Sequence, residues 1–286
     1  MTELTLTDKV QSPVFEAKPP STICTCVTWL SPSDIAVGCA DGFVAVWNIT
    51  STQPTSANPF PYFYKWIHSS YVLSITSAYP AYPHLIATTS MDGETRLSSI
   101  LQPHTDVTEA TRMRMGSPHI VFSPILQSFL SSEENESIRL LVLRRFFTST
   151  SVARLSSAVS ALATPSLWHP AIMIGCTSGA VLATNPIRRI LSVRVRQWQV
   201  TWFTHEWVPR EGSSGVSRFL DGFRAEQVAL QRNLSADRNK SRHSVTTIFE
   251  EGTHVTALAW NPNQSCAGWA SAGMGCGLVR VEDVAL

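Results

Sequence analysis

The sequence predicts an all-β protein, namely a β-propeller that is incomplete, with five recognisable blades and room for a sixth. Two observations support this: short apolar segments recur along the chain, and turn dipeptides separate them. Of the 286 residues, 44% are hydrophobic and 15% are charged. This composition suffices for a sizeable core and is too poor in charge for a disordered chain. We therefore expect one propeller domain over residues 1–286.

The repeat consists of three short segments. An alternating apolar segment is followed by a polar or proline-containing turn, a second apolar segment, a tight turn and a third alternating segment. The copies cover residues 24–49, 72–100, 117–143, 159–187 and 255–284. Their anchor residues, Val27, Ile75, Ile120, Leu162 and Leu258, are 48, 45, 42 and 96 residues apart. Because the last interval is twice the first, it has room for a sixth copy.

The tight turns explain the three-segment pattern. Asp41-Gly42 and Asp92-Gly93 are dipeptides that tolerate the positive φ of a two-residue hairpin. Ser178-Gly179 and Cys276-Gly277 keep the glycine, whereas Glu136-Ser137 loses it and predicts a looser hairpin. Each copy thus supplies three hairpin-linked strands, and a fourth, outer strand is expected from the linkers. We assign residues 13–20 to the outer strand of the first blade and residues 245–252 to that of the last.

Two stretches resemble the WD-repeat family: ADGFVAVWNI (40–49), with Trp47-Asn48 at the Trp-Asp position, and IHSSYV (67–72), with His68. The other copies depart from the Trp-Asp pattern, so no copy is expected to form the family's full His/Ser/Trp/Asp network. The resemblance implies blades held together mainly by apolar packing. It gives repeat-structural roles to His68, Asp41, Gly42, Trp47, Asp92 and Gly93. Such propellers usually have seven blades, so either the ring is irregular or the chain is a C-terminal portion of a longer protein, which we favour.

Residues 188–243 break the period. They contain 11 Lys/Arg and five acidic residues, or +6, whereas the rest of the chain sums to −5. We expect a strand at 190–203, a flexible stretch at 209–217, a turn at Asp221-Gly222 leading into a short helix from about Phe223, and a polar loop. One interpretation of the charge is a solvated loop. The other is a surface for phosphates or an acidic partner, because basic residues interleaved with aromatic ones suit nucleic acids.

Three tryptophans lie close together in this insertion. Trp198 and Trp202 share the parity of Arg194 and Arg196 along the expected strand, while Trp207 lies beyond it. Ordinary packing between blades would account for the first two, and Trp207 is the better candidate for a partner contact. The candidate partner or nucleic-acid surface comprises Arg194, Arg196, Trp202, Trp207, Arg218, Phe219 and Arg224.

Catalytic, metal and cofactor sites are not predicted. The six cysteines show no CxxC or zinc-finger spacing, and we expect reduced, buried thiols. His205-Glu206 beside Trp207 could suggest acid–base chemistry, but no nucleophile accompanies the pair. The sequence shows neither a signal peptide nor an apolar run long enough to span a membrane. We therefore expect a non-enzymatic protein with no cofactor, no metal, no membrane association and no small-molecule substrate.

The C-terminal third resembles a narrower family. The runs at 199–209, 217–230 and 250–283 are similar to the fungal WD-repeat subunit of transcription factor IIIC, over about 85 residues. The resemblance implies a nuclear scaffold in the B-box-binding arm of that complex, which supports RNA polymerase III transcription of tRNA-type genes. Its expected partners are a second propeller subunit and the large DNA-binding subunit, with an auxiliary, indirect contact to DNA.

Two alternatives remain open. The chain could be a generic WD-repeat adaptor that binds peptides and has no link to transcription, or an enzyme on a propeller scaffold. Members of the narrower family carry a long polar N-terminal region that is missing here, which leaves any DNA contact made by that region in doubt.

Overall fold

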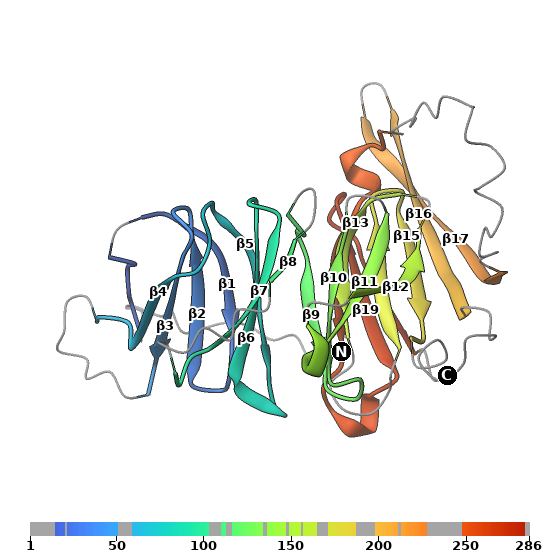
Figure 1. Cartoon of the computed structure of the whole chain (residues 1–286). Helices are drawn as coiled ribbons and strands as arrows, with labels where there is room; N and C mark the ends of the chain where they lie inside the picture. The colour runs from blue at the N-terminus through green and yellow to red at the C-terminus, as the bar shows by residue number, and fades with distance from the viewer. Residues whose placement is uncertain are drawn as a thin grey trace, which may run out of the picture.

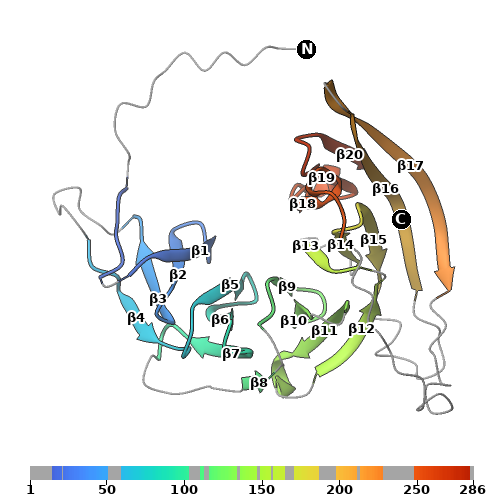
Figure 2. The same ribbon diagram turned by 90° about the horizontal axis from the view of Figure 1, so that it is seen from above.

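Five antiparallel β-sheets stand side by side around an arc, each with its first strand toward the centre (Figure 2). The prediction of an all-β propeller is confirmed, and the two ends of the arc lie apart in the part of the chain described. The computed structural model describes residues 15–20, 22–50, 59–102, 110–112, 116–133, 136–146, 149–155, 157–164, 171–186, 198–210, 213–227 and 248–283.

The strands follow one another in each sheet in chain order (Figure 1). The first sheet contains β1 (Cys24–Trp29), β2 (Asp34–Cys39), β3 (Phe43–Asn48) and β4 (Phe63–Trp66). The second contains β5 (Val72–Ala78), β6 (Tyr82–Ser90), β7 (Glu94–Ser99) and β8 (Ala110–Arg112). The third contains β9 (Ile120–Ser123), β10 (Ser128–Ser132), β11 (Ser137–Val142) and β12 (Ser149–Arg154). The fourth contains β13 (Val159–Ala163), β14 (Ile172–Cys176), β15 (Ala180–Thr184), β16 (Trp198–Arg210) and β17 (Ser213–Gln227). The fifth contains β18 (Val255–Trp260), β19 (Trp269–Met274) and β20 (Val279–Asp283). Single turns of 3₁₀-helix lie at Leu143–Arg145 (η1), Glu251–Thr253 (η2) and Gln264–Cys266 (η3).

The predicted hairpin turns adopt the expected backbone. Gly42 and Gly93 have φ of 85° and 80°. Asp41 and Asp92 each accept a hydrogen bond from the backbone N–H two residues on, at 3.2 and 2.8 Å. At the turn without glycine, Glu136 itself takes a φ of 62°, a conformation that costs a residue with a Cβ about 1 kcal/mol or more. The dipeptides therefore mark the hairpins between the second and third strands.

Apolar side chains fill each junction between neighbouring sheets. Val44 and Val46 on β3 pack with Val72 and Ile86 of the second sheet. Equivalent clusters join the second sheet to the third, the third to the fourth and the fourth to the fifth. Burial of such side chains stabilises a fold by about 1.5–3 kcal/mol each. Packing between blades therefore forms the core, as the sequence predicts.

Hydroxyl groups add polar links between the inner strands. Thr25 donates to the carbonyl oxygen of Val72 at 2.5 Å, and Ser77 donates back to that of Leu30 at 3.0 Å. Thr164 donates to the carbonyl oxygen of Phe122 at 2.7 Å. These bonds fix the register of one blade against the next, which apolar contacts alone do less well because they are not directional.

Both linker assignments for the outer strands are wrong for the residues described. The outer strand of the first sheet is β4, and residues 15–20 form no strand, because two prolines at 19 and 20 remove the N–H donors that a ladder needs. In the fifth sheet, β20 pairs only with β19, and residues 248–253 form an extended entry followed by the turn η2.

The double-length interval holds no separate sixth sheet in its described part. Residues 198–210 and 213–227 form the fourth and fifth strands of the fourth sheet instead. The reason is continuous pairing: Ala180–Thr184 pairs with residues 199–204, and those residues also pair with β17. A long partner strand thus takes up the residues that the spacing alone would assign to a sixth blade.

Candidate interaction surface

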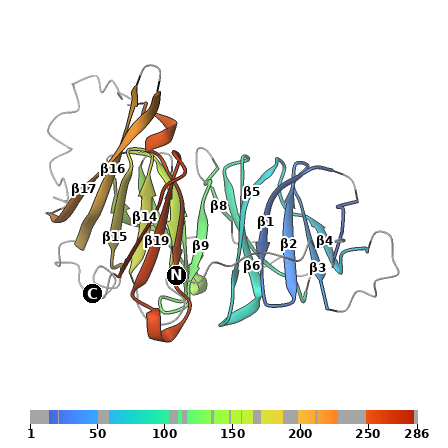
Figure 3. The same ribbon diagram turned by 180° about the vertical axis from the view of Figure 1, so that it is seen from behind.

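The fourth sheet ends in a long hairpin formed by β16 and β17. The strands have 13 and 15 residues, and their pairing runs from Trp198–Gln227 to Arg210–Ser213. The tip of the hairpin rises beyond the ends of the other strands in both side views (Figures 1 and 3). The flexible stretch expected at 209–217 is therefore mostly strand.

The helix expected from Phe223 is wrong over the part described, because residues 223–227 belong to β17. The rest of the expected helix and the polar loop lie outside the described residues. Pairing with a strand of matching length overrides the local preference of this segment.

Trp202 lies in the core and not on an exposed surface. Its side chain is 4% exposed and meets Trp260 of the fifth sheet edge-on, with 5.7 Å between ring centroids. The ladder shifts register between Thr201 and Phe203, and Trp202 and Phe203 are both buried in the same cluster. The assignment of Trp202 to a partner surface is thus wrong. Trp198 begins β16.

Trp207 joins the hairpin to the entrance of the last blade. A Cβ added to Gly215 would lie 2.3 Å from Trp207 Cζ2, and one added to Gly252 would lie 2.7 Å from Trp207 Cδ1. The indole therefore lies against two glycines, one on β17 and one on the returning chain. The backbone N–H of Trp207 donates to Thr253 Oγ1 at 3.1 Å. Contacts within the chain account for the partial burial of Trp207, which the sequence had favoured as a partner contact.

His205 occupies a repeat position that the insertion concealed. Its backbone N–H donates to the carbonyl oxygen of Gly179 at 2.9 Å, as that of His68 does to Gly42 at 3.1 Å. Each histidine follows its glycine by 26 residues, and this spacing is the signal that would have found it. The residues that exceed the regular blade length therefore lie between His205 and β18, and the irregular segment does not begin at residue 188.

The two histidines make related contacts. His68 Nδ1 bonds Asp92 Oδ2 at 3.0 Å and Nε2 bonds Thr88 Oγ1 at 2.8 Å, while Ser98 stands at the tryptophan position. Burial lowers the pKa of His68 even though the Asp92 carboxylate opposes the shift. The neutral imidazole therefore acts as a structural bridge between the approach to β5 and the next hairpin turn.

Around His205, other groups take the partner positions. Nδ1 lies 3.3 Å from the carbonyl oxygen of Thr253, Nε2 bonds Ser217 Oγ, and Cys276 Sγ lies 3.7 Å from Nε2. Cys276 precedes Gly277 in the last hairpin turn, where the second blade has Asp92. Because His205 is fully buried, it is closed to a substrate in this structure. Glu206, on the opposite face of β16, bonds Arg218, so the acid–base pair considered from the sequence is not formed.

The remaining surface candidates divide between core and solvent. Phe219 packs edge-on against Phe203, with 5.6 Å between centroids, and the Arg280 guanidinium lies 5.1 Å from its ring centre. Arg218 is exposed and its Nη2 lies 2.6 Å from Glu206 Oε2. Arg224 lies in β17 opposite Thr201, whereas Arg194 and Arg196 lie outside the described residues. The exposed face of the hairpin instead carries aliphatic residues that sequence reasoning missed: Val208, Val216 and Leu220.

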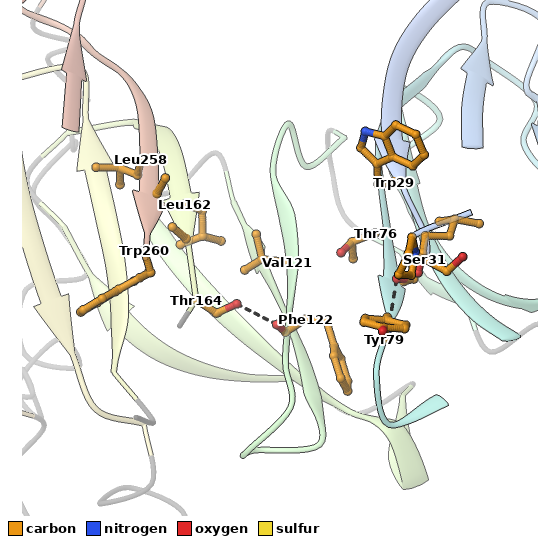
Figure 4. Close-up of a pocket in the computed structure, with 15 residues that line it drawn as sticks. Trp29, Ser31, Thr76, Tyr79, Val121, Phe122, Leu162, Thr164, Leu258 and Trp260 are labelled. Atoms are coloured by element: carbon orange, nitrogen blue, oxygen red, sulfur yellow. Dashed lines mark hydrogen bonds between the residues drawn. The ribbon is translucent and has the colours of Figure 1, made fainter. Parts of the chain in front are cut away.

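A pocket of about 680 Å³ lies where the inner strands end (Figure 4). Trp29, Tyr79, Leu162 and Trp260 line it, and it draws residues from all five sheets. None of its described lining residues carries a charge. The pocket therefore suits a neutral, apolar group and not a phosphate.

The cysteines form no disulfide. Only Cys39 and Cys176 are buried, so the expectation of six buried thiols is wrong, most plainly for the exposed Cys24. Burial, with Asp41 nearby, raises the pKa of Cys39 to about 12. Within the residues described, no cluster of His, Cys, Asp and Glu is arranged to hold a metal ion. In that same part of the chain, no helix is long and apolar enough to cross a membrane.

Comparisons with known proteins point to one group of relatives. No family model matches the chain. The chain is 30% identical over 266 residues to "Transcription factor tau subunit sfc6" of Schizosaccharomyces pombe, covering 91% of the chain and 42% of that protein. It is 27% identical over 169 residues to "Transcription factor tau 91 kDa subunit" of Saccharomyces cerevisiae, covering 58% of the chain and 24% of that protein.

The chain thus spans less than half the length of the curated relatives it matches. The match to the fission yeast protein nevertheless takes in 266 residues, far more than the C-terminal third. The resemblance first seen in the C-terminal third is therefore confirmed, and the chain is a homologue of fungal transcription factor tau (transcription factor IIIC) subunits.

Proposed function

We propose that the chain is a non-enzymatic scaffold subunit of transcription factor IIIC, which supports transcription of tRNA-type genes by RNA polymerase III in the nucleus. The observation that carries the proposal is the relationship to a tau subunit over 91% of the chain. Its partners in this proposal are a second propeller subunit and the large DNA-binding subunit. The blades serve as the rigid support, and the hairpin is the element that rises beyond them.

The hairpin supports protein contacts more than DNA contacts. Its described strands contain three arginines and three acidic residues, and Arg218 is already paired with Glu206. Trp202 and Phe219, which could have stacked on bases, pack against other parts of the chain. Stacking on aromatic faces and unpaired positive charge are what nucleic acids need. An auxiliary contact with DNA would therefore involve residues outside the hairpin strands.

Affinity purification tests the proposal. The tagged full chain would be expressed in fission yeast and purified from nuclear extract, and co-purifying tau subunits would be quantified by mass spectrometry. Chromatin immunoprecipitation would compare tRNA genes with genes read by RNA polymerase II. We expect tau subunits to be recovered and tRNA genes to be enriched. Recovery of an unrelated stable complex without tau subunits would contradict the proposal.

The apolar pocket favours a second candidate function, peptide recognition by an adaptor. A neutral pocket of about 680 Å³ with Trp29 and Tyr79 at its wall fits an apolar side chain of a peptide. The test is the pair of variants Trp29→Ala and Tyr79→Ala, both of which alter half-exposed side chains. Loss of a co-purifying protein that is not a tau subunit, with tau recovery unchanged, would favour this function.

A further inference from the structure

The outer edge of β17 is unusual for this fold. The outermost strands of the first three sheets, β4, β8 and β12, have 4, 3 and 6 residues, whereas β17 has 15 and ends the order of its sheet. Long open edges are templates for pairing with another chain, and proteins usually shorten them or protect them with lysine or proline. Residues 213–227 contain neither. This edge is therefore suited to pairing with a further strand.

The exposed face beside this edge is aliphatic. Val208 pairs directly with Val216, and Leu220, four residues further along β17, lies on the same face. These three side chains are 53%, 41% and 40% exposed. Alternation along a strand places every second side chain on one face, so they form a stripe in which Arg218 lies between Val216 and Leu220. An added strand with apolar residues at alternate positions would bury this stripe as it pairs.

The opposite face is fixed to the last blade. Trp207 lies against Gly252, His205 is held by Thr253, and Phe219 lies beneath the guanidinium of Arg280. These contacts order the hairpin before any partner arrives. Binding then costs less conformational entropy than it would for a loop that has to be ordered first.

Charge indicates the chemistry of the partner. Arg218 lies between the valine pair and Leu220 on the exposed face, with its side chain 64% exposed, and Arg210 is exposed near the tip. Glu206 pairs with Arg218, so of the described charges beside the valine pair two are positive and one is negative. A segment with an acidic residue is therefore favoured here over a basic one.

We propose that an extended segment of another polypeptide, whose apolar and acidic residues take turns along one face, pairs as a sixth strand with the edge of β17 that no described strand occupies. Its apolar side chains cover Val208, Val216 and Leu220, and a carboxylate between them on the same face lies beside Arg218. The inference rests on the proposed function, since the other polypeptide would be a neighbouring subunit of the same complex.

Fluorescence anisotropy with the full chain tests this mode of binding. The probe is a labelled peptide of about ten residues with threonine at every second position and valine and glutamate in turn at the positions between, and the comparison peptide has lysine in place of each glutamate. We expect the glutamate peptide to bind at least about tenfold more tightly. A third peptide, N-methylated at the glutamate peptide residues that would pair with β17, should lose binding because the methyl groups remove the donors.

Variants then locate the site. Val216→Glu should weaken binding of the glutamate peptide more than about tenfold, because it removes apolar surface and adds a like charge. Val142→Glu alters a half-exposed valine of the third sheet and should leave binding unchanged. Hydrogen exchange should show protection of residues 213–220 when the glutamate peptide binds.

Three results would overturn the inference. They are no binding of the glutamate peptide at millimolar concentration, binding that Val216→Glu or N-methylation leaves intact, or binding of a thymidine oligonucleotide that depends on Val216. The purification of tau subunits is a separate measurement. Recovered tau subunits with a failed peptide test would refute strand addition alone, whereas absent tau subunits would refute the proposed function.

Discussion

The backbone N–H of His205 lies 2.9 Å from the carbonyl oxygen of Gly179 and donates a hydrogen bond to it. The bond reproduces the one between His68 and Gly42 three blades earlier. It shows where the regular blade pattern stops: His68 precedes β5 by four residues, whereas His205 precedes β18 by 50. The chain completes the outer strand of its fourth blade, leaves the arc of blades, and returns to begin the fifth.

Gly179→Ala should destabilise the protein strongly. Its φ is 78°, and an added Cβ would lie 2.0 Å from the carbonyl oxygen of His205. Gly277→Ala is the matched control, since its φ is 87° but no atom lies within 4 Å of the added Cβ. We expect the control to lower the free energy of unfolding by about 1–2 kcal/mol from backbone strain alone. Gly179→Ala should lower it by at least about 2 kcal/mol more than the control does. Urea denaturation measures both, and equal losses would contradict the role assigned to the His205 contact.

Trp202→Ala should lower the free energy of unfolding by about 3–5 kcal/mol, because it leaves a cavity between the fourth and fifth sheets. Val208→Ala, on the exposed face of the same strand, should change it by about 0.5 kcal/mol or less. Thermal and urea unfolding measure both. A Trp202→Ala protein of unchanged stability that fails to assemble would show that the indole faces a partner after all.

Arginine substitutions should differ according to their surroundings. Arg218 forms an exposed pair with Glu206, so Arg218→Gln should cost less than about 1 kcal/mol. The Arg280 guanidinium lies 4.5 Å from the ring centre of Phe203 and near Phe219, so Arg280→Gln should cost about 1–2 kcal/mol. Arg280 also pairs with Glu282, so both arginines should contribute less at high salt, and unfolding in low and high salt measures both effects. A larger loss for Arg218→Gln would contradict these assignments.

Acidification should destabilise the fold through His68. Burial lowers the pKa of His68 below its ordinary value of 6.5, so the folded state resists protonation more than the unfolded chain does. The stability that depends on the neutral ring is present above about pH 6.5 and is lost as the pH falls toward the lower pKa of the folded state. We expect the free energy of unfolding to fall between pH 7.5 and 5, and to fall less steeply in His68→Asn.

His119 provides the control for that measurement, because burial lowers its pKa as well. His119→Asn should remove only its own share of the pH dependence and leave that of His68. The same slope in wild type and in His68→Asn would show that His68 does not titrate in this range.

The blades were predictable because their determinants are local. Alternation in short segments and a glycine at 42, 93, 179 and 277 specify the hairpins wherever they occur in a chain. The outer strands were assigned less well, because their partners are distant in sequence. No local pattern in Phe63–Trp66 indicates that it pairs with β3. Only the prolines at 19 and 20 argue against residues 13–20 as the outer strand of the first blade.

The sequence predicted a strand in this region but not which of its side chains are exposed. Alternation assigned Trp202 and two arginines to one face, but a shift of register at residues 201–203 buries Trp202 and Phe203 together. A local shift of this kind leaves no clear mark in the sequence. The valine pair on the exposed face depends on pairing between β16 and β17, whereas the composition of residues 209–217 suggested only a flexible stretch.

The segment that begins after His205 leaves and rejoins the arc of blades at nearly one point, since Trp207 and Thr253, 46 residues apart, are joined by a 3.1 Å hydrogen bond. The entropy of closing such a loop grows only with the logarithm of its length, at about 0.6 kcal/mol for each doubling. Sequences of very different size can therefore be inserted or deleted between these two residues at little cost to the blades. Evolution can vary what this part of the molecule contacts while the blades that carry it stay the same.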